Sequence, residues 1–322
     1  MSYINLKGRN LLTLMDFAKE EITHLIYLSA KLKLDKRTKT EEKQLVGKKI
    51  ALIFEKESTK TRVAFEVAAF DQGAFTTYFA AAGGQIGKTE SPADTARTLG
   101  RLYDGIQYRG FSQATAEELA KFAGVPVWSG LTDTEHPLQV LGDLLTIKEH
   151  SEKPYDQIVL AYVGDGRNNI ANALMAGCYK MGIQFRIVSP RELFPQQKIG
   201  DKTILTDNIM EGVKGADFIY TDVWVSAGED ENLWEVRAKL LADYQVNRRL
   251  LEATGNKNVK FMHCLPAYHD TKTAMGKSMF QKYGLACMEV TDDVFESENS
   301  IVWDQMENRM HTVKAVMVAT IK

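Results

Sequence analysis

The sequence predicts an α/β protein of two domains, each built on a mostly parallel sheet with helices on both faces. Three observations predict this fold. Short apolar runs rich in β-branched residues alternate with longer helical patterns. The 322 residues correspond to about two domains, at a prior of roughly 150 residues per domain. The alternation restarts after the polar segment around Pro154, so we expect a domain boundary near residue 150.

The first half of the chain is expected to contain four strands, each followed by a helix. Residues 50–54 form a wholly apolar run, which is typical of a strand buried on both faces of a parallel sheet. Leu141, Leu144 and Leu145 recur at helical spacing and indicate an amphipathic helix. The expected strands are 50–54, 77–79, 105–108 and 125–128, and the expected helices are 62–70, 93–103, 114–122 and 139–149.

The second half repeats this rhythm without an obvious repeat of the sequence. Its expected strands are 158–163, 185–188, 217–220 and 259–262, and its expected helices are 169–181, 233–250 and 307–320. Ligands bind at the carboxyl ends of the strands in open α/β sheets. We therefore look for functional side chains in the loops that follow strands.

Composition excludes several classes of protein. With 40 Lys and Arg against 42 Asp and Glu, the formal net charge is −2, unlike that of a strongly basic nucleic-acid binder or a highly charged disordered chain. The cysteines, Cys178, Cys264 and Cys287, are too few for a disulfide framework and indicate a reducing compartment. No apolar run approaches the roughly 20 residues of a membrane span, and residues 1–10 lack a secretory signal. We expect a cytoplasmic protein that binds neither membrane nor nucleic acid.

An anion-binding loop is predicted where the first strand leads into a helix. Residues 58–62 read Ser-Thr-Lys-Thr-Arg and combine three hydroxyls with two cations at a helix N-terminus. Free backbone N–H groups and the helix dipole favour phosphate there. The glycine pattern of a P-loop is missing. The alternative is a Ser or Thr N-cap with solvated neighbours.

Two further loops of the first half carry candidate ligands. Arg109 follows the strand 105–108, at the same sheet edge as the anion loop. Pro137 suits the first position of a helix, so that His136 and Gln139 offer a donor and an amide at the helix start. Taken alone, Arg109 would more often be a solvated charge, and His136 would more often be a helix-capping residue beside a surface Gln139.

Residues 164–169 follow a strand and read Gly-Asp-Gly-Arg-Asn-Asn. A dinucleotide fingerprint needs a third glycine where Asn169 stands, so we reject NAD binding. Asn168 and Asn169 are instead interpreted as polar groups at the strand edge, with simple turn chemistry as the alternative. Asp222 follows the strand 217–220 and could pair with a substrate ammonium group, or form only an Asx turn.

The segment His263-Cys264-Leu265-Pro266 ends the last strand of the second domain. Neighbouring residues of a strand point to opposite faces, so adjacency in sequence does not indicate a Cys–His nucleophilic pair. No Cys and His cluster has the spacing of a zinc site. Cys178 and Cys287 are interpreted as structural.

Taken together, these motifs resemble those of the ornithine carbamoyltransferase family, within the aspartate/ornithine carbamoyltransferase superfamily. The order and spacing of the motifs fit this family over nearly the whole chain. The His-Cys-Leu-Pro segment resembles the ornithine branch of the superfamily and distinguishes it from the aspartate branch. The segments that carry the resemblance are 58–62, 85–87, 108–110, 136–139, 222–228, 263–266 and 307–311.

The resemblance implies an architecture and an assembly. A carbamoyl-phosphate-binding domain would comprise residues 1–150 together with a C-terminal helix, 305–322, that packs back on it. An ornithine-binding domain would comprise residues 151–304. The family pattern further implies a homotrimer or a multiple of trimers, with active sites between subunits. Gln85 would reach into the active site of a neighbouring subunit. Closure of the domains and folding of the loop 226–228 would exclude water.

The implied reaction is carbamoyl transfer from carbamoyl phosphate to the side-chain amine of L-ornithine, giving L-citrulline and phosphate, or the reverse in arginine catabolism. It needs no metal or redox cofactor, because positioning and charge stabilisation do most of the catalysis. The resemblance assigns catalysis to Cys264, Arg109, His136 and Arg309. It assigns carbamoyl phosphate to Ser58, Thr59, Lys60, Thr61, Gln85, Arg109, His136, Gln139, Cys264, Leu265 and Arg309, and ornithine to Asn169, Asp222, Ser226 and Ala227. Arg62 is expected beside the same anion.

Three departures from the family pattern leave alternatives open. Lys60 stands where an arginine is usual, which keeps the charge but loses the bidentate fork. Ala227 replaces a methionine of the substrate loop, and the segment between Pro190 and Thr206 is short. The alternatives are a carbamoyltransferase for a different diamino acid or diamine, and a weakly active or non-catalytic paralogue.

Overall fold

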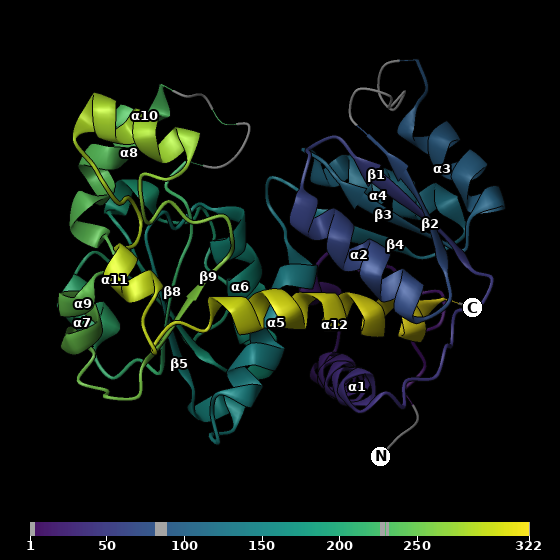
Figure 1. Cartoon of the computed structure of the whole chain (residues 1–322), viewed down its shortest axis with the longest axis horizontal. Coiled ribbons are helices and arrows are strands. Elements are labelled where there is room, and N and C mark those ends of the chain that lie inside the picture. The colour runs from purple at the N-terminus through teal and green to yellow at the C-terminus, as the bar shows by residue number, and fades with distance from the viewer. Residues whose placement is uncertain (1–3, 81–88, 226–228, 230–231, 322) are drawn as a thin grey trace. The chain divides into compact units, whose positions relative to one another are not determined.

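The computed structural model describes residues 4–80, 89–225, 229 and 232–321. The chain divides into two compact units. Unit 1 comprises Met1–His150 and Met306–Lys322, and unit 2 comprises Ser151–Gln305. Each is built on one parallel sheet, which confirms the predicted fold class (Figure 1).

The sheet of unit 1 has four strands in the order β2-β1-β3-β4. Ala51 and Ile53 of β1 face α3 and α4 on one side of the sheet, in a core that includes Leu99 and Leu119. On the opposite side, Trp128 of β4 contacts the ring of Phe65. The strands are β1 (Lys49–Phe54), β2 (Phe75–Phe79), β3 (Gly105–Arg109) and β4 (Val127–Leu131). The helices are α1 (Lys19–Thr38), α2 (Thr59–Asp71), α3 (Pro92–Leu102), α4 (Gln113–Ala123), α5 (Pro137–Glu149) and α12 (Val302–Thr320), with a 3₁₀ turn, η1, at Leu14–Asp16.

Register brings the functional loops of unit 1 to one edge of its sheet. Phe54 of β1 pairs with Arg109 of β3, which in turn pairs with Leu131 of β4. Each of these residues is the last of its strand. Because the strand pairs of this sheet are parallel, these ends lie at the same edge. The loops that begin α2 and α5 therefore open at the carboxyl edge, where α/β proteins bind ligands.

Helix α12 belongs to unit 1 except for its first turn, and lies between α1 and α2 in Figure 1. Lys33 of α1 donates to Asn308 over 2.6 Å. The ammonium group of Lys314 is fully buried and donates to Glu41 over 2.5 Å and to Asp71 over 2.7 Å. These contacts join the end of the chain to elements from its first quarter. Among the described residues, no helix is long and apolar enough to cross a membrane.

Unit 2 has a five-stranded parallel sheet in the order β7-β6-β5-β8-β9. The strands are β5 (Val159–Val163), β6 (Gln184–Val188), β7 (Thr203–Thr206), β8 (Phe218–Thr221) and β9 (Lys260–His263). The helices are α6 (Asn169–Met181), α7 (Ile209–Val213), α8 (Leu233–Leu241), α9 (Arg248–Ala253), α10 (Ala274–Tyr283) and α11 (Asp292–Phe295). The 3₁₀ turns are η2 (Tyr155–Gln157), η3 (Arg191–Leu193) and η4 (Ala242–Tyr244).

The prediction of one helix over 233–250 is wrong. Helix α8 ends at Leu241, and after η4 the backbone becomes extended at Gln245. Val246 then exchanges backbone hydrogen bonds with the segment around Val290, donating to Glu289 and accepting from Thr291. Asn247 caps the new helix α9 by accepting from the N–H of Leu250. A pairing partner more than forty residues away thus interrupts a locally helical pattern.

Candidate functional site

The predicted anion loop forms the N-terminus of α2. Ser58 is the N-cap residue, and its Oγ accepts a hydrogen bond from the N–H of Thr61 over 3.3 Å. The N-cap named as the alternative is therefore present as well. It is compatible with anion binding, because the cap satisfies one N–H and leaves the others of the first turn to point outward. Thr59 is exposed and Lys60 is half-buried. Both lie on the first turn, where the helix dipole favours an anion.

The Thr61 hydroxyl is the centre of the site in unit 1. It accepts from Arg309 Nη2 over 2.6 Å, from Arg109 Nη1 over 3.3 Å and from Ser58 Oγ over 3.2 Å. A hydroxyl oxygen has only two lone pairs, so the three donors around it outnumber the hydrogen bonds that it can accept. Such an excess of donors, two of them guanidinium groups, is the arrangement expected of a pocket for an oxyanion.

Close packing of α5 on α12 brings Arg309 to this position. Gly142 of α5 faces the backbone of α12, and a Cβ at residue 142 would lie 3.1 Å from the Cα of Arg309. The absent side chain lets the two helices approach. Arg309 is 3% exposed, so its charge is held in a medium where electrostatic interactions are strong.

His136 and Gln139 stand at the start of α5, as predicted from Pro137. Burial, followed by the charges of Arg309 and Arg109, lowers the pKa of His136 well below its usual value. The imidazole is therefore neutral near pH 7, and its Nδ1 has no hydrogen-bond partner among the described residues. Gln139 Nε2 donates to Asp143 over 2.8 Å, which fixes the amide and leaves its carbonyl oxygen outside that bond.

A buried tyrosine shapes the turn after β3. Tyr108 donates to Glu55 Oε2 over 2.7 Å, and the Glu55 N–H donates to the carbonyl of Arg109. A Cβ at Gly110 would lie 2.1 Å from the Tyr108 hydroxyl and 2.4 Å from Glu55 Oε2. Glycine is thus required at residue 110, and the turn holds Arg109 at the sheet edge.

Arg62 does not join the other cations of the site. Its guanidinium group pairs with Glu66 over 2.8 Å and lies 4.0 Å from the ring centre of Tyr78. The side chain is 45% exposed. The expectation that Arg62 contributes to the same anion site is therefore wrong, because position 62 of α2 turns toward solvent while position 61 turns inward.

The second group of candidate residues lies in unit 2, at the carboxyl ends of β5, β8 and β9. Asn168 caps α6 by accepting from the N–H of Ile170 over 2.7 Å, and Asn169 is the first residue of that helix. Asp222 follows β8 and is buried. Burial raises the pKa of Asp222 to about 7, against the opposing effects of His263, the Val223 N–H and a hydrogen bond with Asn168. This carboxyl group changes its charge near neutral pH.

His263 belongs to a buried network that the sequence did not reveal. Its Nδ1 lies 2.8 Å from the carbonyl of Cys264, and its Nε2 lies 3.2 Å from Glu289 Oε1. The same Glu289 oxygen accepts from the Tyr268 N–H over 2.6 Å. Glu289 is 26 residues away in a segment without any recognised motif, so only the fold brings it to His263. Cys264 is buried beside this network, and Leu265 is half-buried.

Three predicted site residues lie outside the described residues. They are Gln85, Ser226 and Ala227. Their assignments to carbamoyl phosphate and to ornithine rest on the resemblance alone.

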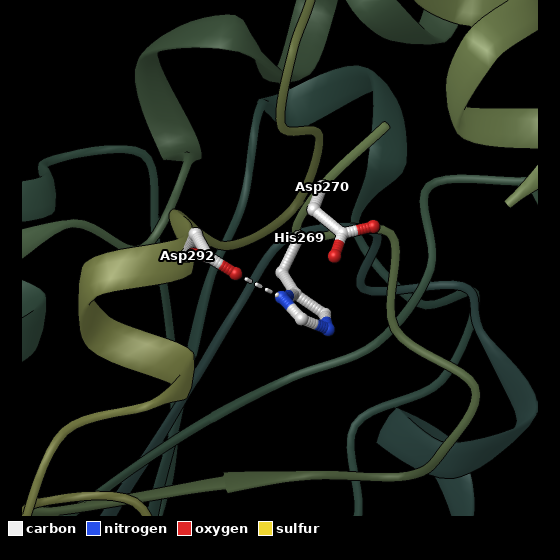
Figure 2. Close-up of side chains that lie close together, drawn as sticks. All are labelled: His269, Asp270 and Asp292. Atoms are coloured by element: carbon white, nitrogen blue, oxygen red, sulfur yellow. Dashed lines mark hydrogen bonds and ion pairs between the residues drawn. The ribbon is translucent and has the colours of Figure 1, made fainter. Parts of the chain in front are cut away.

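One cluster of metal-ligand types occurs in the described part of the chain. Figure 2 shows His269, Asp270 and Asp292, whose nearest ligand atoms lie within 4.8 Å of one another. His269 Nδ1 hydrogen-bonds Asp292 over 2.6 Å, and its ring stacks on Phe295 at 3.8 Å. Asp270 pairs with Lys272 over 2.9 Å. Because an ammonium group already neutralises Asp270, we interpret the cluster as an anchor for α11.

Comparison with known proteins identifies relatives of both units. The family model described as aspartate/ornithine carbamoyltransferase, carbamoyl-P binding domain, matches residues 9–149. The model described as the Asp/Orn binding domain of the same family matches residues 156–320. Catabolic ornithine carbamoyltransferase 1 of Staphylococcus epidermidis is 55% identical over 328 residues, covering 98% of this chain and 99% of that protein.

Solved structures agree with this result. The ornithine carbamoyltransferase of Pyrococcus furiosus is 38% identical with a TM-score of 0.89, covering 99% of each chain. That of Thermus thermophilus is 34% identical with a TM-score of 0.82, covering 97% of this chain and 99% of the other.

Proposed function

Because the chain belongs to the aspartate/ornithine carbamoyltransferase family, we propose that it transfers a carbamoyl group from carbamoyl phosphate to the side-chain amine of L-ornithine. The products are L-citrulline and phosphate, and the same residues serve the reverse reaction. Similarity to a relative named as catabolic supports the reverse direction, as used in arginine breakdown. The observation that carries the proposal is the convergence of two guanidinium groups on Thr61 at the N-terminus of α2.

In this proposal the two domains divide the substrates. Residues 1–150 with the helix 305–322 bind carbamoyl phosphate, and residues 151–304 bind ornithine. The phosphate oxygens occupy the first turn of α2, where Ser58, Thr59 and Lys60 surround them and Arg109 offers its guanidinium group. Gln85 completes this set. The helix dipole and the cations together offset the charge of the phosphate.

Arg309, Thr61 and the neutral His136 then polarise the carbamoyl carbonyl oxygen. Negative charge builds on that oxygen when the amine attacks, so fixed donors stabilise the transition state more than the substrate. The carbonyl oxygen of Gln139, whose amide is oriented by Asp143, accepts from the carbamoyl NH₂ group. The backbone of Leu265 holds the same group.

Asp222 pairs with the α-ammonium group of ornithine, while Asn169, Ser226 and Ala227 hold its α-amino and α-carboxyl ends. Cys264 lies beside the side-chain amine and helps to present it unprotonated. The neutral amine attacks the carbonyl carbon, forming a C–N bond. The tetrahedral intermediate then breaks its bond to the phosphate oxygen, and the departing phosphate takes up the proton that the nitrogen loses.

The assembly and the compartment are part of the same proposal. We expect a homotrimer or a multiple of trimers, with Gln85 reaching into a neighbouring subunit, and we expect the enzyme to act in the cytoplasm. Light scattering coupled to size exclusion tests the assembly. A monomer at micromolar concentration would contradict it.

A steady-state assay with carbamoyl phosphate and L-ornithine tests the proposed activity. It should yield citrulline and phosphate in equal amounts. Arg309→Gln should remove most of this activity, whereas Arg97→Gln is a matched control, because Arg97 pairs with Asp94 on the exposed surface of the same unit. Equal activity in both variants would contradict the assignment of Arg309.

A further inference from the structure

Arg237 of α8 makes a buried ion pair that the proposed chemistry does not use. Its Nη1 contacts Asp165 Oδ2, and its Nη2 lies 3.8 Å from Glu229 Oε1. The side chains of Arg237 and Asp165 are only 11% and 6% exposed. Buried ion pairs are poor sources of stability, because desolvating two charges costs about as much as their attraction returns. Such a pair is better explained by the geometry that it fixes.

Asp165 shapes the turn between β5 and α6. Its Oδ1 accepts from the Arg167 N–H over 3.0 Å, and its carbonyl accepts from the Asn168 N–H over 3.1 Å. One residue therefore uses both its side chain and its backbone to close the turn. The turn delivers Asn168 and Asn169 to the first turn of α6.

The turn also contacts the carboxyl group that we assign to ornithine. Asn168 accepts from the Ile170 N–H through Oδ1, and its side chain hydrogen-bonds Asp222. A continuous series of contacts thus runs from Arg237 through Asp165 and the turn to Asn168 and Asp222. All of its members lie within unit 2.

We propose that Arg237 is a positioning residue for ornithine, which holds Asp165 so that the turn keeps Asn168, Asn169 and Asp222 in their binding geometry. The inference rests on the proposed function, since it names a further determinant of the same amino-acid site. Glu229 is a secondary partner, because its contact with Arg237 is longer and its side chain is 36% exposed.

Kinetics of Arg237→Gln and Asp165→Asn in the full-length protein test this inference. Each change should raise the KM for ornithine about tenfold, the size expected for coupled neighbours. The KM for carbamoyl phosphate should stay within twofold, because the residues assigned to its phosphate group all lie in unit 1. The double variant should be no worse than the poorer single variant, since both changes remove one interaction. Arg237→Lys keeps the charge but not the planar fork, and should show an intermediate KM.

Arg248→Gln is the matched control. Arg248 also lies in unit 2 and pairs with an aspartate, Asp293, over 3.5 Å, but both side chains are more than half exposed. Its substitution should leave both KM values unchanged. Melting temperatures and equilibrium binding of norvaline, which lacks the side-chain amine, separate positioning from general destabilisation.

The outcomes are distinct. If Arg237→Gln lowers only the melting temperature and leaves the ornithine KM and norvaline affinity unchanged, Arg237 is merely structural and the inference is overturned. Equal rises in both KM values would also overturn it. If Arg237→Gln does not fold, Arg237→Lys and Asp165→Asn still decide. A wild-type protein that forms no citrulline overturns the proposed function itself.

Discussion

Arg309 donates through Nη2 to the hydroxyl oxygen of Thr61 over 2.6 Å, although the two residues are 248 positions apart. Thr61 lies in the first turn of α2, and Arg309 lies in the last helix of the chain. The anion site of unit 1 is therefore incomplete until α12 has packed on α5. The site thus needs the last helix of the chain as well as residues from its first quarter.

Replacing Thr61 should reveal this dependence. Thr61→Val keeps the shape of the side chain but removes the oxygen on which Arg309, Arg109 and Ser58 converge. We expect kcat/KM for carbamoyl phosphate to fall on the order of 100-fold, as when one polarising donor is lost. Thr61→Ser keeps the hydroxyl and should lose less than tenfold. Steady-state kinetics measure both, and equal losses would contradict the special role given to the hydroxyl group.

Lys60→Arg tests the cation that departs from the family pattern. A guanidinium group can bind two phosphate oxygens in a planar fork, whereas an ammonium group acts as a point charge. If Lys60 binds phosphate, the substitution should lower the KM for carbamoyl phosphate. Lys7→Arg, outside the site, serves as the control. An unchanged or higher KM for Lys60→Arg would count against phosphate binding by Lys60.

Asp222 should make amino-acid binding depend on pH. Burial raises its pKa to about 7, so the carboxyl group is protonated below that pH and cannot attract the α-ammonium group. We predict that the affinity for norvaline, measured by calorimetry with carbamoyl phosphate present, weakens as the pH falls from 8 to 6. Norvaline has no side-chain amine, so that titration does not interfere.

Asp222→Asn should bind norvaline more weakly at pH 8 and lose this dependence on pH. The raised pKa of Asp222 also affects the stability of the folded state. A carboxyl group whose pKa is raised in the folded state stabilises that state at low pH, and this contribution disappears as the pH rises through about 7. A pH-independent affinity in the wild-type protein would contradict the assignment of Asp222 to the ammonium group.

Lys314 should matter for stability rather than for substrate recognition. Its ammonium group is buried against Glu41 and Asp71. Although burial opposes the effect, the ammonium groups of Lys314 and Lys36 lower the pKa of Asp71. Lys314→Met would leave the carboxylates without this partner, so the free energy of unfolding should fall by about 3–5 kcal/mol.

Urea denaturation followed by circular dichroism measures this loss. Lys31→Met removes an ion pair with Asp35 on α1 in which the Lys31 side chain is exposed, so the urea midpoint should stay close to that of the wild-type protein. Similar midpoints for Lys314→Met and the wild-type protein would show that the buried network does not hold α12 in place.

Sequence reasoning succeeded where local signals and tertiary structure agree. Residues 169–181 were predicted as a helix and form α6 with the same bounds, because Asn168 caps its start and Gly182 adopts a positive φ at its end. The run 50–54 became β1 because five consecutive apolar residues suit a central strand. Strand β4 was placed too early, since it continues through Ser129 and Gly130, which carry little strand preference.

The candidate site was predicted only in part, for physical reasons. Ser58 and Pro137 mark helix starts through local chemistry, so the loops around them could be found from the sequence. Other contacts join residues that no local sequence pattern relates. Examples are the hydrogen bond between His263 and Glu289 and the ion pair between Arg237 and Asp165. Arg62 is an error of the opposite kind, a residue wrongly included. Its sequence position suggested a ligand of the anion, but its place on α2 turns the side chain toward Glu66.

The most direct test is an amine panel at saturating carbamoyl phosphate, with product formation followed for ornithine, lysine, 2,4-diaminobutyrate and putrescine. Asp222 and Asn169 are assigned to the α-groups of the acceptor, so putrescine, which lacks them, should be a poor substrate. We predict that ornithine is preferred by a wide margin in kcat/KM and is converted to citrulline. No citrulline above background, or a higher kcat/KM for another amine, would contradict the account.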